Sequence, residues 1–124
     1  MEVKDYMQKN QINEAIAMLE FLKKREKYNF NILFELGRAY LQVGNNKQAI
    51  DNFKECLKIR YDERVEFLLA KILKNTGQYR NALKILLKLK KKENFNLDID
   101  IAIVEIFLNM KRYVWSKKYI DKYL

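Results

Sequence analysis

Few side chains in this sequence could perform covalent or acid–base chemistry. It contains no histidine and one cysteine, Cys56. Without histidine there is no imidazole base, no Ser-His or Cys-His pair and no histidine metal ligand. A lone cysteine forms no intramolecular disulfide, and we interpret Cys56 as a core thiol. Asp98 and Asp100 are explained by favourable placement near a helix N-terminus. We therefore expect no enzymatic activity, no cofactor and no bound metal.

Basic side chains are the most abundant charged groups. The chain has 25 lysines and arginines against 16 acidic residues, a formal net charge of +9. Many of them fall late in predicted helices, at residues 23–25, 58–60, 88–92 and 117–122. The helix dipole favours cations there, so we interpret most of them as solvated helix ends. The second interpretation is a basic ridge for an acidic protein partner. We do not expect nucleic acid binding, because no phosphate-binding loop or base-stacking pattern is present.

The helices that must carry these groups are clearest between residues 33 and 53. Apolar residues recur at spacings of three and four from Leu33 to Tyr40, which indicates one face of a helix. A second stripe surrounds Phe53, and Ala49 is small enough to let two helix backbones approach. Glycine and asparagine at positions 44–46 interrupt the pattern. This segment is therefore predicted to be a helix hairpin with an apolar inner face.

The same pattern recurs along the chain. A small residue in the second helix returns at intervals of 34, 33 and 34 residues, as Ala15, Ala49, Ala82 and Ser116. The large apolar residue four positions later is Leu19, Phe53, Leu86 and Ile120, and a site of close approach in the first helix is Gly37, Ala70 and Val104. Turn positions align as Asn10, Gly44, Gly77 and Lys111. Agreement of several columns predicts an array of similar units.

These columns resemble the tetratricopeptide signature, in which Leu-Gly and Tyr on one helix and Ala and Phe on the next recur about every 34 residues. The resemblance covers almost the whole chain. It implies an all-α fold: a right-handed superhelical array of antiparallel helix hairpins, an α-solenoid of about three and a half to four repeats. We expect a single domain over 1–124, with units of about 1–28, 29–61, 62–95 and 96–124. The first unit should have a truncated first helix ending at a turn near Asn10.

The resemblance also implies a concave groove, lined by the first helices of successive units, that holds an extended peptide or a partner helix. Transferred to this sequence, the groove comprises Asn31, Phe34, Arg38, Leu41, Arg64, Phe67, Lys71, Lys74, Asn75, Ile101, Glu105 and Asn109. One column, Phe34, Phe67 and Ile101, is apolar, and the column beside it is mostly basic. We expect a protein or peptide partner that carries acidic side chains or apolar anchors. The alternative is that Phe34 and Phe67 turn inward and pack between helices.

The last helix departs from its siblings. Trp115 occupies a column that is polar in the other units, and Tyr119 and Tyr123 add apolar surface. One interpretation is that Trp115 covers the end of the core. The other is that Trp115, Tyr119 and Tyr123 form an assembly edge. The alternative function is then a structural or self-assembly module, either a homo-oligomer or a fragment of a longer repeat protein.

The N-terminal segment and the hydropathy pattern predict the location of the protein. The first ten residues carry Glu2, Lys4, Asp5 and Lys9 and have no apolar core, unlike a signal peptide. No segment reaches the roughly 18 consecutive apolar residues of a membrane span. A cytoplasmic protein without a membrane span is expected.

Overall fold

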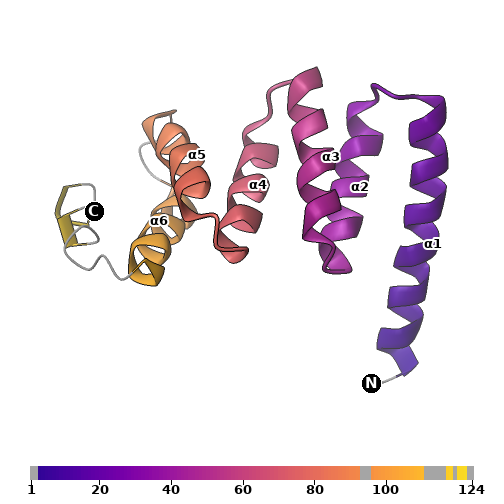
Figure 1. The fold of residues 1–124 in the computed structure, drawn as a ribbon, viewed down its shortest axis with the longest axis horizontal. Helices are drawn as coiled ribbons and strands as arrows, with labels where there is room; N and C mark the ends of the chain where they lie inside the picture. The colour runs from indigo at the N-terminus through magenta and orange to yellow at the C-terminus, as the bar shows by residue number, and fades with distance from the viewer. Residues whose placement is uncertain (1–2, 93–95, 111–116, 119, 123–124) are drawn as a thin grey trace. The chain divides into compact units, whose positions relative to one another are not determined.

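A computed structural model describes residues 3–92, 96–110, 117–118 and 120–122 (Figure 1). The labelled helices in these ranges are α1 (Val3–Arg25), α2 (Phe30–Gln42), α3 (Asn46–Ile59), α4 (Glu63–Asn75), α5 (Tyr79–Lys92) and α6 (Leu97–Asn109), and residues 117–118 and 120–122 are helical as well. Helix is the only regular secondary structure in these ranges, which confirms the all-α prediction. Of the described helices, none combines the length and the apolar composition needed to cross a membrane.

Helices α2 and α3 form the predicted hairpin, and their facing sides are the core of the N-terminal part. Leu33 and Leu36 of α2 and Ala49 and Phe53 of α3 are all buried. The spacing of three and four residues places these side chains on the inner face of each helix. Gly37 is buried against the Phe53 ring, so it is the site of close approach that the repeat pattern predicted.

The turns of two hairpins use the same chemistry. Gly44 and Gly77 have φ values of +81° and +83°, in the left-handed region that glycine adopts without a steric penalty. The backbone N–H of Asn45 donates to the carbonyl of Tyr40 at 2.9 Å, and that of Gln78 donates to Leu73 at 2.8 Å. The Asn45 side chain then caps α3 by accepting from the N–H of Gln48. The predicted turns at Gly44 and Gly77 are therefore confirmed.

The turn predicted at Asn10 is wrong. Helix α1 runs without interruption from Val3 to Arg25 and passes through Asn10. No glycine accompanies Asn10, and an asparagine inside a helix costs only a few tenths of a kcal/mol relative to better helix formers, about 0.7 at most. The segment before Asn10 therefore continues α1 and does not fold back beside it as a first helix.

Contacts divide the chain into two compact units, Met1–Val65 and Glu66–Leu124. In the first, α1 packs on α2 and α2 packs on α3. The Tyr40 hydroxyl donates to Glu20 at 2.8 Å, and Lys23 donates to Asn52 at 3.0 Å, which joins α1 to α2 and α3. In the second unit, α5 packs on α6, and Lys88 pairs with Glu66 of α4. The core of this unit contains Leu69, Ile72, Ala82, Leu86, Leu89, Ala102, Ile103 and Ile106.

Candidate functional site

Helix α2 carries an aromatic ring beside a cation on its partly exposed face. The Phe34 ring is half-buried and packs against Phe53, with ring centroids 6.1 Å apart. Arg38, one turn later, places its guanidinium carbon 5.8 Å from the centroid of the Phe34 ring and remains exposed. Glu35 lies 3.7 Å from the Arg38 guanidinium, and such an exposed pair contributes little to stability. This arrangement combines an apolar contact surface with an accessible positive charge.

Helix α4 repeats the arrangement in the second unit. The Lys71 ammonium lies 5.6 Å from the centroid of the Phe67 ring. Phe67 is half-buried and Lys71 is exposed, as in the α2 pair. Both rings are therefore half-buried. Their burial is intermediate between the predicted groove contact, which needs an exposed ring, and the inward alternative, which needs a buried one.

Two other predicted groove residues bind each other. Lys74 of α4 forms an ion pair with Glu105 of α6, and the lysine side chain is only 11% exposed. A cation that is largely buried and already paired has little capacity left for a ligand. The pair does bring α4 and α6, the predicted first helices of two consecutive units, together within the second compact unit.

Arg64, another predicted groove residue, pairs with the neighbouring Asp62. Its guanidinium lies 3.1 Å from the Asp62 carboxylate, and its backbone N–H donates to the same side chain. These hydrogen bonds lower the pKa of Asp62 below its usual range. Asp62 thus stays charged and caps the start of α4, and Arg64 supports that cap.

The remaining predicted contacts vary in accessibility. Asn31, Asn75, Ile101 and Asn109 are exposed, and Leu41 is half-buried. Ile101 and Glu105 line a shallow hollow on α6 of about 270 Å³, together with Ile120. The predicted assembly edge of Trp115, Tyr119 and Tyr123 lies outside the described residues.

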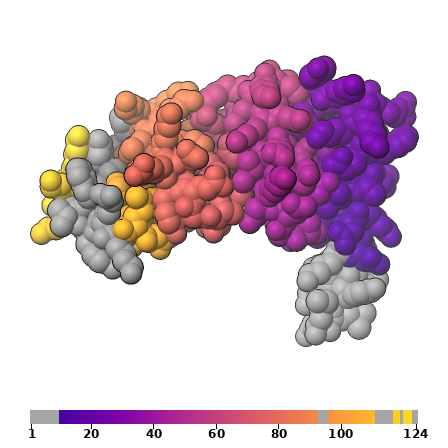
Figure 2. All heavy atoms as spheres, in the orientation of Figure 1, coloured from indigo at the N-terminus to yellow at the C-terminus, as the bar shows by residue number. Residues whose placement is uncertain are grey.

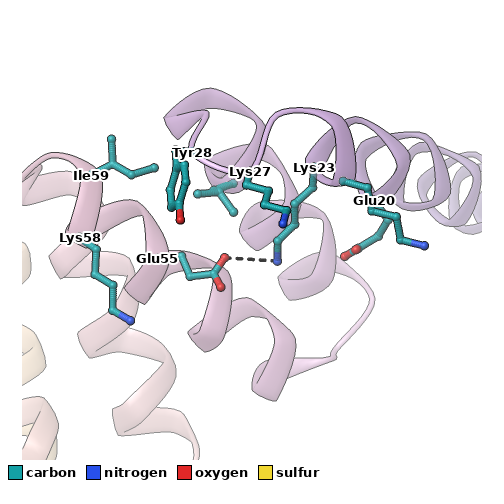
Figure 3. A pocket seen from close by; sticks show the side chains of 9 residues that line it. Glu20, Lys23, Lys27, Tyr28, Glu55, Lys58 and Ile59 are labelled. Carbon is teal, nitrogen blue, oxygen red and sulfur yellow. Dashed lines mark ion pairs between the residues drawn. The ribbon is translucent and has the colours of Figure 1, made fainter.

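The first unit contains a pocket that the sequence did not predict. It has a volume of about 520 Å³ and lies between the C-terminal ends of α1 and α3 (Figure 3). Its lining is Glu20, Lys23, Lys24, Lys27, Tyr28, Leu33, Glu55, Lys58 and Ile59. Figure 3 shows Lys23 of α1 reaching Glu55 of α3, at 3.3 Å. Lysines at the ends of second helices were the only sequence signal for this place.

The lysines differ in their environment. In the described part of the chain, no ion pair involves Lys24, Lys27 or Lys58, in agreement with solvated helix ends. Lys90 contradicts that interpretation. It is buried and forms an ion pair with Asp100 at 2.9 Å, with side chains 8% and 5% exposed. Asp100 is therefore more than a favourable charge at a helix N-terminus, and the cap of α6 is Asn96.

Cys56 is confirmed as a core thiol. It is fully buried, and its Sγ donates a weak hydrogen bond to the Phe30 carbonyl at 3.6 Å. Burial, followed by the charge of Glu55, raises the pKa of the Cys56 thiol to about 12. In the ranges that the structure describes, no three Asp, Glu or Cys side chains gather as metal ligands would.

The raised pKa predicts slow thiol chemistry. The thiolate is the nucleophile, so a pKa of about 12 instead of 9 lowers its population about a thousandfold at pH 8. We expect the folded protein to react with an aromatic disulfide reagent at least about a hundredfold more slowly than the urea-unfolded protein. The rate should rise with pH. Equal rates for the folded and unfolded protein at pH 8 would contradict this placement of Cys56.

Comparisons with known proteins agree with the architecture. Residues 30–63 match the tetratricopeptide repeat family. Among solved structures, the crystal structure of MamA superposes with a TM-score of 0.79 and 17% identity, over 98% of this chain and 72% of that one. YrrB, described as a TPR protein with an unusual peptide-binding site, superposes with a TM-score of 0.80 and 18% identity, over 94% of this chain and 61% of that one.

A third structure extends the pattern. TTC0263, a thermophilic TPR protein in Thermus thermophilus, gives a TM-score of 0.66 and 18% identity, over 81% of this chain and 52% of that one. This chain thus spans about half to three quarters of the length of these proteins. At such identities the likeness establishes the fold. A search of curated proteins found no match.

Proposed function

We propose that this protein is a non-enzymatic interaction scaffold, because residues 30–63 match the tetratricopeptide repeat family and the chain has the fold of TPR proteins. It binds an extended peptide or a partner helix along the partly exposed faces of its first helices. The ligand carries carboxylates next to aromatic or aliphatic anchors. The partner is a protein, because the fold presents helical surfaces. Catalysis is not part of the proposal, since the chain has no histidine and the pKa of its one thiol is raised.

The observation that carries this proposal is the recurrence of one aromatic–cation pair. Phe34 with Arg38 on α2 and Phe67 with Lys71 on α4 stand 33 residues apart, at the same place in consecutive predicted units. Core packing accounts for one side of each ring, but it requires no exposed cation beside the ring. Aromatic and arginine side chains carry much of the binding energy at interfaces.

The chemistry of each pair defines the ligand. The ring face offers apolar area, and the cation attracts a carboxylate placed one or two residues from the anchor. The net charge of +9 adds a long-range attraction for acidic partners, which raises association rates at low salt. YrrB, which has the same fold, is a precedent for peptide binding by such an array.

Charge reversal at both pairs tests the proposal. Arg38→Glu with Lys71→Glu should weaken capture of the partner from nuclease-treated lysate, with at least about a tenfold loss of affinity for the protein recovered. Both side chains are exposed, so the free energy of unfolding should change by less than about 1 kcal/mol. The readout is affinity capture followed by titration with the purified partner.

A matched control separates site-specific loss from a general charge effect. Lys47→Glu with Lys84→Glu changes the net charge by the same amount at exposed positions of α3 and α5. This variant should retain the partner. If both double variants lose the partner equally, or if both retain it, the first-helix faces are not the binding surface.

A further inference from the structure

Helix α1 leaves an apolar face without a covering helix in the described part of the chain. Met18 is 68% exposed, Phe21 60% and Leu22 38%. Ala15 beside them is exposed too. The opposite side of α1 packs on α2 and bonds to it through Glu20. In Figure 2, side chains of α1 (indigo) form part of the molecular surface.

In the repeat pattern, this face of α1 corresponds to a buried face of α3. Ala15, Met18 and Leu22 align, at an interval of 34 residues, with Ala49, Asn52 and Cys56 of α3. All three α3 residues are 0% exposed. Cys56 donates to the carbonyl of Phe30 of α2, and Asn52 accepts from Lys23 of α1. On α1 the corresponding side chains are exposed, and the segment before Asn10 continues α1 without folding back over them. Neighbouring exposed apolar side chains are typical of interaction surfaces.

The charges around the stripe indicate what covers it. Glu14, Met18, Phe21 and Arg25 follow spacings of four, three and four, which places them along one seam of the helix. The Arg25 guanidinium lies 6.0 Å from the centroid of the Phe21 ring, so it remains on this seam. The seam is symmetric in character, with an acidic end, two large apolar residues and a basic end. The midpoint of Met18 and Phe21 is also the midpoint of Glu14 and Arg25.

We propose that α1 pairs with α1 of a second copy of this chain in an antiparallel, two-fold symmetric interface. A two-fold axis at that midpoint places Met18 against Phe21 of the second copy, twice. It also places Glu14 against Arg25 of the second copy at both ends. Each acidic residue thus meets a basic one. The second copy covers the face of α1 that no helix covers in the described part of the chain.

The interface differs from the first-helix faces that bind the partner, so it is a separate property of the protein. Its symmetry makes a sharp test. In Glu14→Arg, both ends of a homodimer have arginine facing arginine, and in Arg25→Glu both ends have glutamate facing glutamate. Each variant repels itself. A mixed pair of the two variants, however, has an arginine facing a glutamate at both ends.

The experiment is sedimentation equilibrium on the full chain at low salt, with circular dichroism as the check on folding. The wild type should dimerise, and each single variant should dimerise at least about tenfold more weakly. Their equimolar mixture should recover dimer, and added salt should weaken that mixed dimer. Phe21→Glu, at an exposed site, should be a folded monomer.

Lys54→Glu, an exposed change on α3, is the control for net charge. It should dimerise as the wild type does, and its mixture with Glu14→Arg should not recover the full amount of dimer. A wild type that is monomeric up to high micromolar concentration would overturn the proposal. So would dimerisation that Phe21→Glu leaves intact, or single variants that fail to complement each other when mixed.

Discussion

Replacing Asp100 with alanine is expected to lower the free energy of unfolding by about 3–5 kcal/mol, because it removes the carboxylate that pairs with a buried ammonium group. Lys90 and Asp100 lie 2.9 Å apart, and both side chains are buried between α5 and α6. The desolvated lysine then loses the carboxylate that lies 2.9 Å from its ammonium. Urea denaturation followed by circular dichroism measures the change.

A double replacement distinguishes this cause from a loss of packing. Lys90→Met with Asp100→Leu removes both charges and keeps the site filled, so it should recover most of the stability. The exposed change Asp98→Ala, on the same turn of α6, should cost less than about 1 kcal/mol. If Asp100→Ala costs no more than Asp98→Ala, the buried pair does not stabilise this part of the chain.

Truncation of Phe53 to alanine is the second large effect. The ring is 0% exposed and lies between α3 and α2, against Phe34 and Gly37. Removing it leaves a cavity, and such changes cost about 3–5 kcal/mol. Urea denaturation should therefore show a clear fall in the midpoint of unfolding. A loss below about 1 kcal/mol would mean that α2 and α3 do not pack as described.

Gly37 provides the reciprocal test of that contact. A Cβ at this position would lie 2.6 Å from Phe53 Cδ1, so Gly37→Ala should destabilise the wild type by about 1–3 kcal/mol through overpacking. In the Phe53→Ala background the obstruction is gone. There the helix propensity of alanine should make the same change favourable by about 1 kcal/mol. If Gly37→Ala changes the free energy of unfolding with the same sign in both backgrounds, the two residues are not in direct contact.

The α2–α3 hairpin could be predicted from the sequence because its determinants are local. Periodic apolar residues, Gly37 and the turn at Gly44 each act within a few positions, and they agree with one another. The N-terminal unit could not be predicted in the same way. Asn10 occupies a turn column, but its helix penalty is too small to stop α1 without a glycine.

The candidate site was predictable only in part. The column pattern placed Phe34 with Arg38 and Phe67 with Lys71, and the structure brings each cation to its ring. The column pattern did not show that Lys74 would form an ion pair with Glu105, or that Lys90 would be buried in an ion pair with Asp100. These pairings depend on how separate helices meet in space. A charge late in a helix has the same local pattern whether it is solvated or buried.

The central claim is that the first-helix faces bind the partner. The most direct measurement is a two-dimensional amide NMR titration of the labelled chain with the recovered partner segment. The largest shift changes are expected around Phe34 and Arg38 on α2 and around Phe67 and Lys71 on α4. They should disappear in the Arg38→Glu/Lys71→Glu variant and persist in the Lys47→Glu/Lys84→Glu control. Changes confined to α1, α3 or α5 would contradict the account.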